Sequence, residues 1–262
     1  MKNSKKLISA ILMLALSFVM LVTSSFAWFS MNDEVKATGM TVSAKGDQIY
    51  LQIKGSAFVA EDDNGKEMTE YEVNNTAVEL LPTNARVDLT TAFDLEDTSK
   101  KKGESFIWVT NAGEDAEDGT ATGAYSQVDD SKVDKYVLAT EMYIRLDPTS
   151  GATTAAKPLY VQGVNFGTGT CDVVLKNCVS VMVVCGEFAQ LWTNNGTTFT
   201  QAGGDEYLGE SSFANSTTGT LVTVYVFFNG DDPACTLKNL AEAKAATTNA
   251  NTFTVDVSFS VV

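Results

Sequence analysis

Strict alternation of hydrophobic and polar positions marks two segments near the C-terminal end of the sequence. Between residues 220 and 228, valine or phenylalanine occupies every even position from Val222 to Phe228. Residues 253–261 repeat the pattern from Phe253 to Val261, with Thr, Asp and Ser at the intervening positions. A period of two residues places the apolar side chains on one face of a strand. The pattern therefore predicts two β-strands that each bury one face in a core.

The rest of the chain also has the pattern of short strands. Residues 172–186 are almost continuously apolar, which predicts a central strand covered on both faces. An Asn195-Gly196 pair predicts a tight hairpin turn. Residues 113–134, which are acidic and rich in Gly and Thr, predict a surface loop. Further strands are predicted at 38–44, 47–54, 67–73, 105–110, 136–146, 159–166, 188–192 and 197–200.

A single helix is predicted at residues 237–246, between the last two strands. Thr236 is a suitable N-cap residue, and Leu237, Leu240 and Ala241 fall on one helical face. Many short strands and one helix predict an all-β fold. We expect a jelly roll or β-sandwich with one short crossing helix near the C-terminus.

The N-terminal 27 residues have the three-part pattern of a secretion signal. Lys2, Lys5 and Lys6 precede an uncharged apolar run from Leu7 to Val22, and small residues follow. The pattern predicts cleavage between Ala27 and Trp28. An uncleaved membrane anchor is the alternative, because the uncharged stretch approaches the roughly 20 residues that span a bilayer. We favour cleavage, since the flank after the apolar run carries no positive charge.

Cleavage would leave an aromatic N-terminus followed by a weakly alternating segment. We expect residues 28–44 to form an N-terminal strand segment and residues 45–262 to form a single β-sandwich domain, because no linker-like stretch divides them. Trp28, Phe29, Met31, Val35 and Ala37 are the residues that such a strand would offer to a partner. An apolar end of this kind is unusual on a soluble monomer.

The charge of the chain is strongly negative. It carries 18 basic and 33 acidic residues and a net charge of −15. Removing residues 1–27 takes away three lysines and no acidic residue, which leaves −18. Such a charge disfavours nucleic acid and anionic membranes as partners. We expect a secreted protein, extracellular or attached to the cell surface, with signal peptidase and the export machinery as its transient partners.

The sequence contains no histidine. This excludes Ser-His-Asp and Cys-His catalysis, histidine-ligated zinc and HExxH metalloproteases. Nothing in the spacing of the remaining residues nominates a catalytic group, a metal-ligand set or a cofactor, so we do not expect an enzyme. The acidic turn at residues 62–65 departs from the EF-hand spacing, which favours a solvated hairpin tip over a calcium site.

The four cysteines are Cys171, Cys178, Cys185 and Cys235, and none forms a CxxC pair. A zinc ribbon or a thioredoxin-like site is therefore not expected. In an exported protein an even count permits disulfides. Cys178 and Cys185 would face opposite sides of one strand, which leaves buried free thiols as an equal alternative. Cys235 is the best bridging partner for one of the others.

Two segments resemble the TasA/camelysin-like family of exported Gram-positive proteins, which carry a SipW-type signal peptide. Residues 27–33 (Ala-Trp-Phe-Ser-Met-Asn-Asp) are similar to the Ala-aromatic-Phe-x-Asn-Asp junction of that family. Residues 37–44 are similar to the small-Gly-apolar strand that opens its domain. More loosely, residues 230–235 before a helix and a closing strand resemble the C-terminus of Firmicutes surface proteins with such a leader.

This resemblance implies a jelly-roll subunit of extracellular matrix fibres whose N-terminal strand is donated to the next subunit. It covers about the first fifth of the chain. Camelysins have been described as metalloproteases, an activity that a sequence without histidine does not support.

Two functions therefore stand side by side. The first is a fibre or pilus-like subunit of a biofilm matrix that self-associates by donating its N-terminal strand, with pairing of that strand inside its own domain as the alternative. The second is a monomeric cell-surface module that binds a carbohydrate or protein ligand. For that module the candidate stacking residues are Trp108, Trp192, Tyr125, Tyr143 and Tyr207.

Overall fold

The structure is a computed structural model of the 262-residue chain. It divides into residues 1–34 and a second unit, Val35–Val262. The residues that it describes all lie in the second unit: 36–44, 51–59, 70–73, 78–86, 88–89, 106–112, 121–146, 158–170, 173–209, 218–246 and 252–261. The predicted signal peptide and its cleavage site at Ala27 and Trp28 lie outside the described residues.

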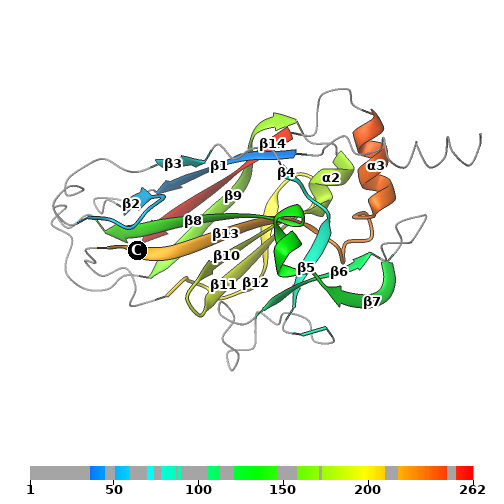
Figure 1. Ribbon diagram of the computed structural model, residues 1–262. Helices are drawn as coiled ribbons and strands as arrows, with labels where there is room; N and C mark the ends of the chain where they lie inside the picture. The colour runs from blue at the N-terminus through cyan, green and yellow to red at the C-terminus, as the bar shows by residue number, and fades with distance from the viewer. Residues whose placement is uncertain are drawn as a thin grey trace, which may run out of the picture. The chain divides into compact units, whose positions relative to one another are not determined.

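The smaller of two sheets contains the first and the last described strands of the chain (Figure 1). Its strand order is β3-β1-β14-β9, and β4 pairs with the beginning of β1. The five strands are β1 (Lys36–Ala44), β3 (Glu70–Val73), β4 (Val78–Glu79), β9 (Leu159–Thr170) and β14 (Thr252–Val261).

The larger sheet is mixed and has the order β12-β11-β10-β13-β5-β6-β7. β8 also pairs with β13, and β2 pairs with β8. β5 runs parallel to β13, whereas the other pairs are antiparallel. The strands are β2 (Leu51–Lys54), β5 (Pro82–Arg86), β6 (Ile107–Ala112), β7 (Ala121–Gln127), β8 (Val137–Leu146), β10 (Val179–Cys185), β11 (Phe188–Asn194), β12 (Phe199–Gly204) and β13 (Thr220–Asn229).

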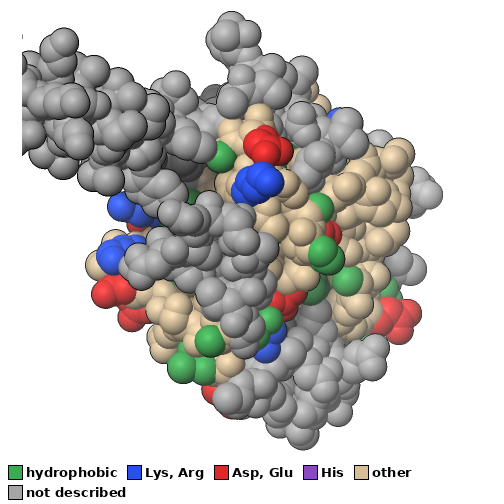
Figure 2. Space-filling view, turned by 90° about the vertical axis from the view of Figure 1, so that its right-hand side faces the viewer, with side chains coloured by type: hydrophobic (Ala, Val, Ile, Leu, Met, Phe, Trp, Pro, Cys, Tyr) green, Lys and Arg blue, Asp and Glu red, His purple; other side chains and the backbone are tan. Residues whose placement is uncertain are grey.

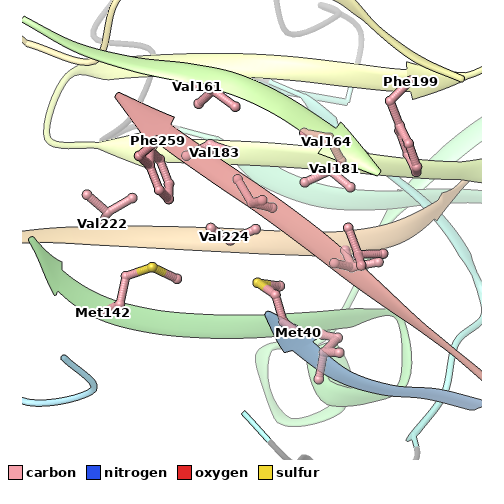
Figure 3. Packing of buried hydrophobic residues seen from close by; sticks show 14 of the residues in the cluster. Met40, Met142, Val161, Val164, Val181, Val183, Phe199, Val222, Val224 and Phe259 are labelled. Atoms are coloured by element: carbon pink, nitrogen blue, oxygen red, sulfur yellow. The ribbon is translucent and has the colours of Figure 1, made fainter. Parts of the chain in front are cut away.

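One hydrophobic core joins the two sheets (Figure 3). The alternating apolar positions predicted for β13 and β14 fill it: Val222, Val224, Val226 and Phe228 from one sheet, and Phe253, Val255, Val257, Phe259 and Val261 from the other. All nine side chains are buried. The prediction of two strands with one buried face is therefore confirmed.

A second cluster lies against the other face of the large sheet. Met182 and Val184 of β10 join Trp108, Phe227 and Val137 there, whereas Val181 and Val183 contribute to the core between the sheets. Every residue of β10 is buried. A strand covered on both faces needs no polar alternation, which explains the unbroken apolar run and confirms its central place between β11 and β13.

The first part of that run is not a strand. Residues Val173–Cys178 form the short helix α2, so the strand predicted for 172–186 was wrong at its beginning. Residues 113–134 were predicted as a loop, yet β7 and the 3-10 helix η1 (Asp130–Lys135) occupy much of that stretch. The hairpin at Asn195-Gly196 is confirmed, with Gly196 at a φ of 91° between β11 and β12.

The predicted helix is confirmed as α3 (Leu237–Ala246), which lies between β13 and β14. Thr236 Oγ1 accepts a hydrogen bond from the Asn239 backbone N–H at 3.1 Å, as an N-cap does. The expectation of a single helix was wrong, because α2 and η1 are also present. The protein is thus a mainly β structure with a large mixed sheet, a small second sheet and short helices.

Candidate functional site

The N-terminal strand β1 is the feature on which the assembly hypothesis depends, and it lies inside the small sheet. On one side it runs parallel to β14, with Lys36 opposite Thr252 and Ala44 opposite Phe259. On the other side it runs antiparallel to β3 and β4. A bulge falls between Ala37 and Met40. β1 is therefore hydrogen-bonded along both edges.

Met40 connects β1 to the core. It is 1% exposed and lies opposite Val255 of β14 and Val73 of β3. Figure 3 shows its side chain in the space between the sheets, where Met142 of β8 also lies. Met40 was not among the predicted assembly residues, most of which stand at odd positions. The bulge between Ala37 and Met40 shifts the alternation, so the buried residue after it stands at an even position. Among the described side chains of β1, Met40 is the one that contacts the core.

The predicted assembly residues are only partly within the described chain. Trp28, Phe29, Met31 and Val35 lie outside the described residues. Ala37 belongs to β1, where it pairs with Phe253 and Val78. In the single chain β1 thus pairs within its own unit, which is the arrangement that the sequence left open beside strand donation.

The parallel pairing of β1 with β14 joins segments from distant parts of the sequence. Parallel neighbours cannot share a tight turn, and most of the chain lies between β1 and β14 in the sequence. Residues 45–50 lead from β1 to β2, which belongs to the large sheet.

The described cysteines are buried free thiols. Cys178 is the last residue of α2 and Cys185 is the last residue of β10. The expectation that the two face opposite sides of one strand was therefore wrong. The thiols of Cys178 and Cys235 hydrogen-bond each other, and this contact together with burial raises the pKa of Cys235 well above its ordinary value. Burial raises the pKa of Cys185 to about 11. Cys171 lies outside the described residues.

The aromatic residues considered for ligand stacking are mostly engaged within the protein. Trp108 is 8% exposed, and its ring lies 5.2–5.5 Å from those of Phe106, Tyr225 and Phe227. The partly buried Trp192 donates from Nε1 to Gln190 at 3.3 Å. The structure therefore does not bring Trp108 to the surface as a stacking platform.

The three tyrosines of that set are dispersed. Tyr207 packs between Tyr160 and Phe188, with ring centroids 6.3 and 6.2 Å away. Tyr143 lies in β8, opposite Leu221 of β13, and Tyr125 lies in β7. Different elements hold these side chains.

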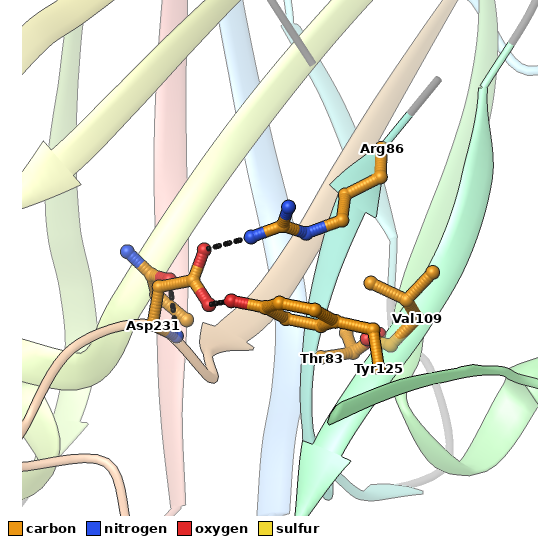
Figure 4. A network of polar contacts seen from close by, with 6 residues as sticks. Thr83, Arg86, Val109, Tyr125 and Asp231 are labelled. Atoms are coloured by element: carbon orange, nitrogen blue, oxygen red, sulfur yellow. Dashed lines mark hydrogen bonds and ion pairs between the residues drawn. The ribbon is translucent and has the colours of Figure 1, made fainter. Parts of the chain in front are cut away.

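A polar network that the sequence did not indicate joins three distant segments (Figure 4). Arg86 of β5 donates to Asp231 Oδ2 at 3.1 Å, and Tyr125 Oη donates to Asp231 Oδ1 at 2.5 Å. The Arg86 guanidinium also lies 3.6 Å from the centre of the Tyr125 ring. Asp231 follows β13 and precedes α3. The network ties β5 and β7 to the turn that leads into α3.

Other kinds of site find no support in the described part of the chain. No group of three or more Cys, Asp or Glu residues converges there as a metal centre would require. None of the described helices has the length and apolarity that crossing a bilayer demands. On the face shown in Figure 2, hydrophobic, basic and acidic side chains are scattered rather than gathered by kind. The acidic turn at 62–65 lies outside the described residues.

Comparisons with protein-family models, with curated proteins and with solved structures find no match for this chain.

Proposed function

We propose that the protein is an exported structural subunit of a cell-surface or matrix fibre, which self-associates when β1 of one copy takes the place of β1 in the next. The observation that carries the proposal is the position of β1. It lies between β14 and the β3/β4 edge, and it reaches the core through Met40. The resemblance of residues 27–33 and 37–44 to matrix-fibre proteins points the same way.

Strand exchange would preserve the interactions that hold β1 at home. The backbone hydrogen bonds to β14 and β3 supply affinity, and a buried side chain such as Met40 fixes the register. Because the contacts are the same in either case, protein concentration decides which arrangement dominates. A donated strand makes a head-to-tail contact, which leaves a free groove at one end and generates a filament.

The jelly-roll description of the fold belongs to the same proposal. Two sheets that share one core are compatible with a jelly roll. The order of residues 230–235, α3 and β14 is compatible with the resemblance to the C-terminus of Firmicutes surface proteins. The alternative, a monomeric surface module for carbohydrate or protein, has less support. Of its candidate stacking residues, Trp108 is buried and the Tyr125 ring is covered by Arg86.

Disulfide trapping between copies tests the proposal directly. Ser43 of β1 and Ser258 of β14 are paired positions, so cysteines placed there lie within bridging reach. One secreted variant carries Ser43→Cys and another carries Ser258→Cys, and N-terminal sequencing first confirms that each begins at Trp28. After mixing and mild oxidation, we expect a disulfide between residues 43 and 258 of different chains, found by non-reducing peptide mapping.

A matched control uses Ser260→Cys in place of Ser258→Cys, because position 260 has no partner on β1. It should give no link to residue 43. A doubly substituted chain, Ser43→Cys with Ser258→Cys, reports pairing at home. If the double variant links only within its own chain at high protein concentration, and the mixture of single variants gives no link, β1 is not exchanged and the proposal fails.

A further inference from the structure

Two buried cysteines meet where the short helices pack together. Cys178 ends α2, and Cys235 lies two residues before α3. α2 contacts α3, and the two thiols hydrogen-bond each other. Cys178 is 0% exposed and Cys235 is 5% exposed, and both belong to the core between the sheets. Two segments that have four strands between them in the chain, β10 to β13, thus bring their sulfur atoms into contact.

The position of Cys185 excludes it from this pair. It ends β10, the strand that begins immediately after Cys178. A seven-residue strand rises about 3.3 Å per residue, which separates its ends by roughly 20 Å. That distance is several times the reach of a disulfide.

We propose that Cys178 and Cys235 are joined by a disulfide in the exported protein, and that Cys185 remains a free thiol. The bond links α2 to the residue before the N-cap of α3. It closes β10, β11, β12 and β13 into one covalent loop and leaves β1 and β14 outside it. The inference does not depend on strand donation, although a loop that leaves out β1 and β14 would not hinder their exchange.

The oxidation requires a disulfide-bearing oxidant, such as a thiol–disulfide oxidoreductase or oxidised glutathione. The thiolate of one cysteine attacks the oxidant's disulfide, forms a mixed disulfide and releases the first thiolate of the oxidant. The second cysteine, after losing its proton, displaces the remaining thiolate. The protein loses two protons and two electrons, and the oxidant gains them as two thiols.

Burial determines when this reaction takes place. A thiolate is the attacking species, and both the hydrogen bond with Cys178 and burial raise the pKa of the Cys235 thiol. The folded protein therefore offers little thiolate to an oxidant that also has poor access to it. Oxidation is expected while the exported chain is still open, and the finished bond is then protected from reductants by the same burial.

Peptide mapping of the secreted protein tests the pair. The protein is alkylated under denaturing conditions without reductant and digested, and the peptides are assigned by mass spectrometry. We expect the peptide that contains Cys178 to be linked to the peptide that contains Cys235, and Cys185 to be alkylated. Pre-treatment of the folded protein with a reductant should leave the link intact, whereas reductant in denaturant should remove it.

Variants separate the bond from simple packing. Cys178→Ser, Cys235→Ser and the double variant should each lower Tm by about 10 °C, because a long covalent loop is lost. Wild-type protein that is refolded in reductant also lacks the bond. Its Tm should therefore lie close to the Tm values of the variants. Cys185→Ala should leave the Cys178–Cys235 link in place.

Two outcomes would overturn the inference. One is that Cys178 and Cys235 are both alkylated in freshly secreted protein and stay so after refolding with oxidised glutathione. The other is that either cysteine is linked to Cys171 or Cys185 instead. Either result leaves the strand-exchange proposal untouched, since Ser43 and Ser258 test that separately.

Discussion

At the scale of single residues, Met40 is where β1 depends most on the core. Met40→Ala removes most of a side chain that is 1% exposed and leaves a cavity between the sheets. We expect the free energy of unfolding to fall by about 2–5 kcal/mol, measured by urea denaturation. Met40→Leu keeps the volume and should cost less than about 1.5 kcal/mol. Equal and negligible losses in both variants would contradict the packing described for β1.

Cys185 gives stability a dependence on high pH. Its pKa is about 11 in the folded protein, against 9.0 for an exposed thiol, because burial disfavours the thiolate. The folded state thus holds the proton more tightly than the unfolded state. The resulting stabilisation is complete below pH 9 and is lost as the pH rises through about 11.

The measurement compares urea unfolding of the wild type and Cys185→Ala between pH 7 and pH 11. The wild type should lose up to about 2 kcal/mol more than the variant over this range. Burial also raises the pKa of Tyr225 in both proteins, so they share a common decline, and the difference between them reports Cys185. Parallel pH curves would show that the thiol is not buried as described.

At the scale of elements, the N-cap of α3 is open to a direct test. Thr236→Ala removes the acceptor for the Asn239 backbone N–H. We expect a loss of about 1 kcal/mol in the free energy of unfolding, whereas Thr236→Ser should retain most of the cap. Thermal or urea unfolding of the three proteins decides it. A loss in Thr236→Ser as large as that in Thr236→Ala would mean that the hydroxyl is not what matters.

The sequence predicted elements well where pattern and environment agree. In β13 and β14 fully buried positions alternate with less buried ones, and in α3 Leu240 is buried while Lys238 and Glu242 are exposed, so their periodicity is visible in the sequence. α2 was mistaken for a strand because its residues continue an apolar, β-branched run. The sequence does hold a helical spacing here, because the apolar Leu175 and Cys178 are three residues apart with the polar Lys176 and Asn177 between them, and the structure buries the first two.

β7 shows a different limit of sequence-based prediction. Its sequence, Ala-Thr-Gly-Ala-Tyr-Ser-Gln, has little hydrophobic alternation and lies in an acidic, Gly-rich stretch. β7 is nonetheless a strand, because it pairs with β6 and because Tyr125 contacts Arg86 and Asp231. Those partners lie far away in the sequence, so no local pattern could have indicated them. Tertiary contacts decide such strands.

At the scale of the whole molecule, the candidate site also depended on long-range pairing. Residues 38–44 could be predicted as a strand, but neither of its partners could be. That β1 lies between β14 and β3, with its Met40 side chain in the common core, follows only from the assembled sheets. The same is true of Cys178 and Cys235, whose sulfur atoms meet because α2 packs against α3.

If β1 can be donated, its place in the small sheet must accept a strand from a separate molecule. A chain that begins at residue 45 lacks β1 and leaves Val255 and Val257 of β14 without their neighbours on that strand. We expect this chain to refold poorly by itself and to form a one-to-one complex when it is refolded with a synthetic peptide of residues 28–44. Near-ultraviolet circular dichroism and size-exclusion chromatography report the recovery.

The peptide can be altered where the intact subunit cannot. A Met40→Asp peptide would bring an unpaired charge into the core and should fail to rescue, whereas Met40→Leu should succeed. Rescue by both peptides would mean that β1 pairs without entering the core. Failure of the unaltered peptide, with a wild-type chain that folds normally, would mean that the groove forms only around a tethered strand. Strand donation between subunits requires a groove that accepts an untethered strand, because the incoming β1 always belongs to another chain.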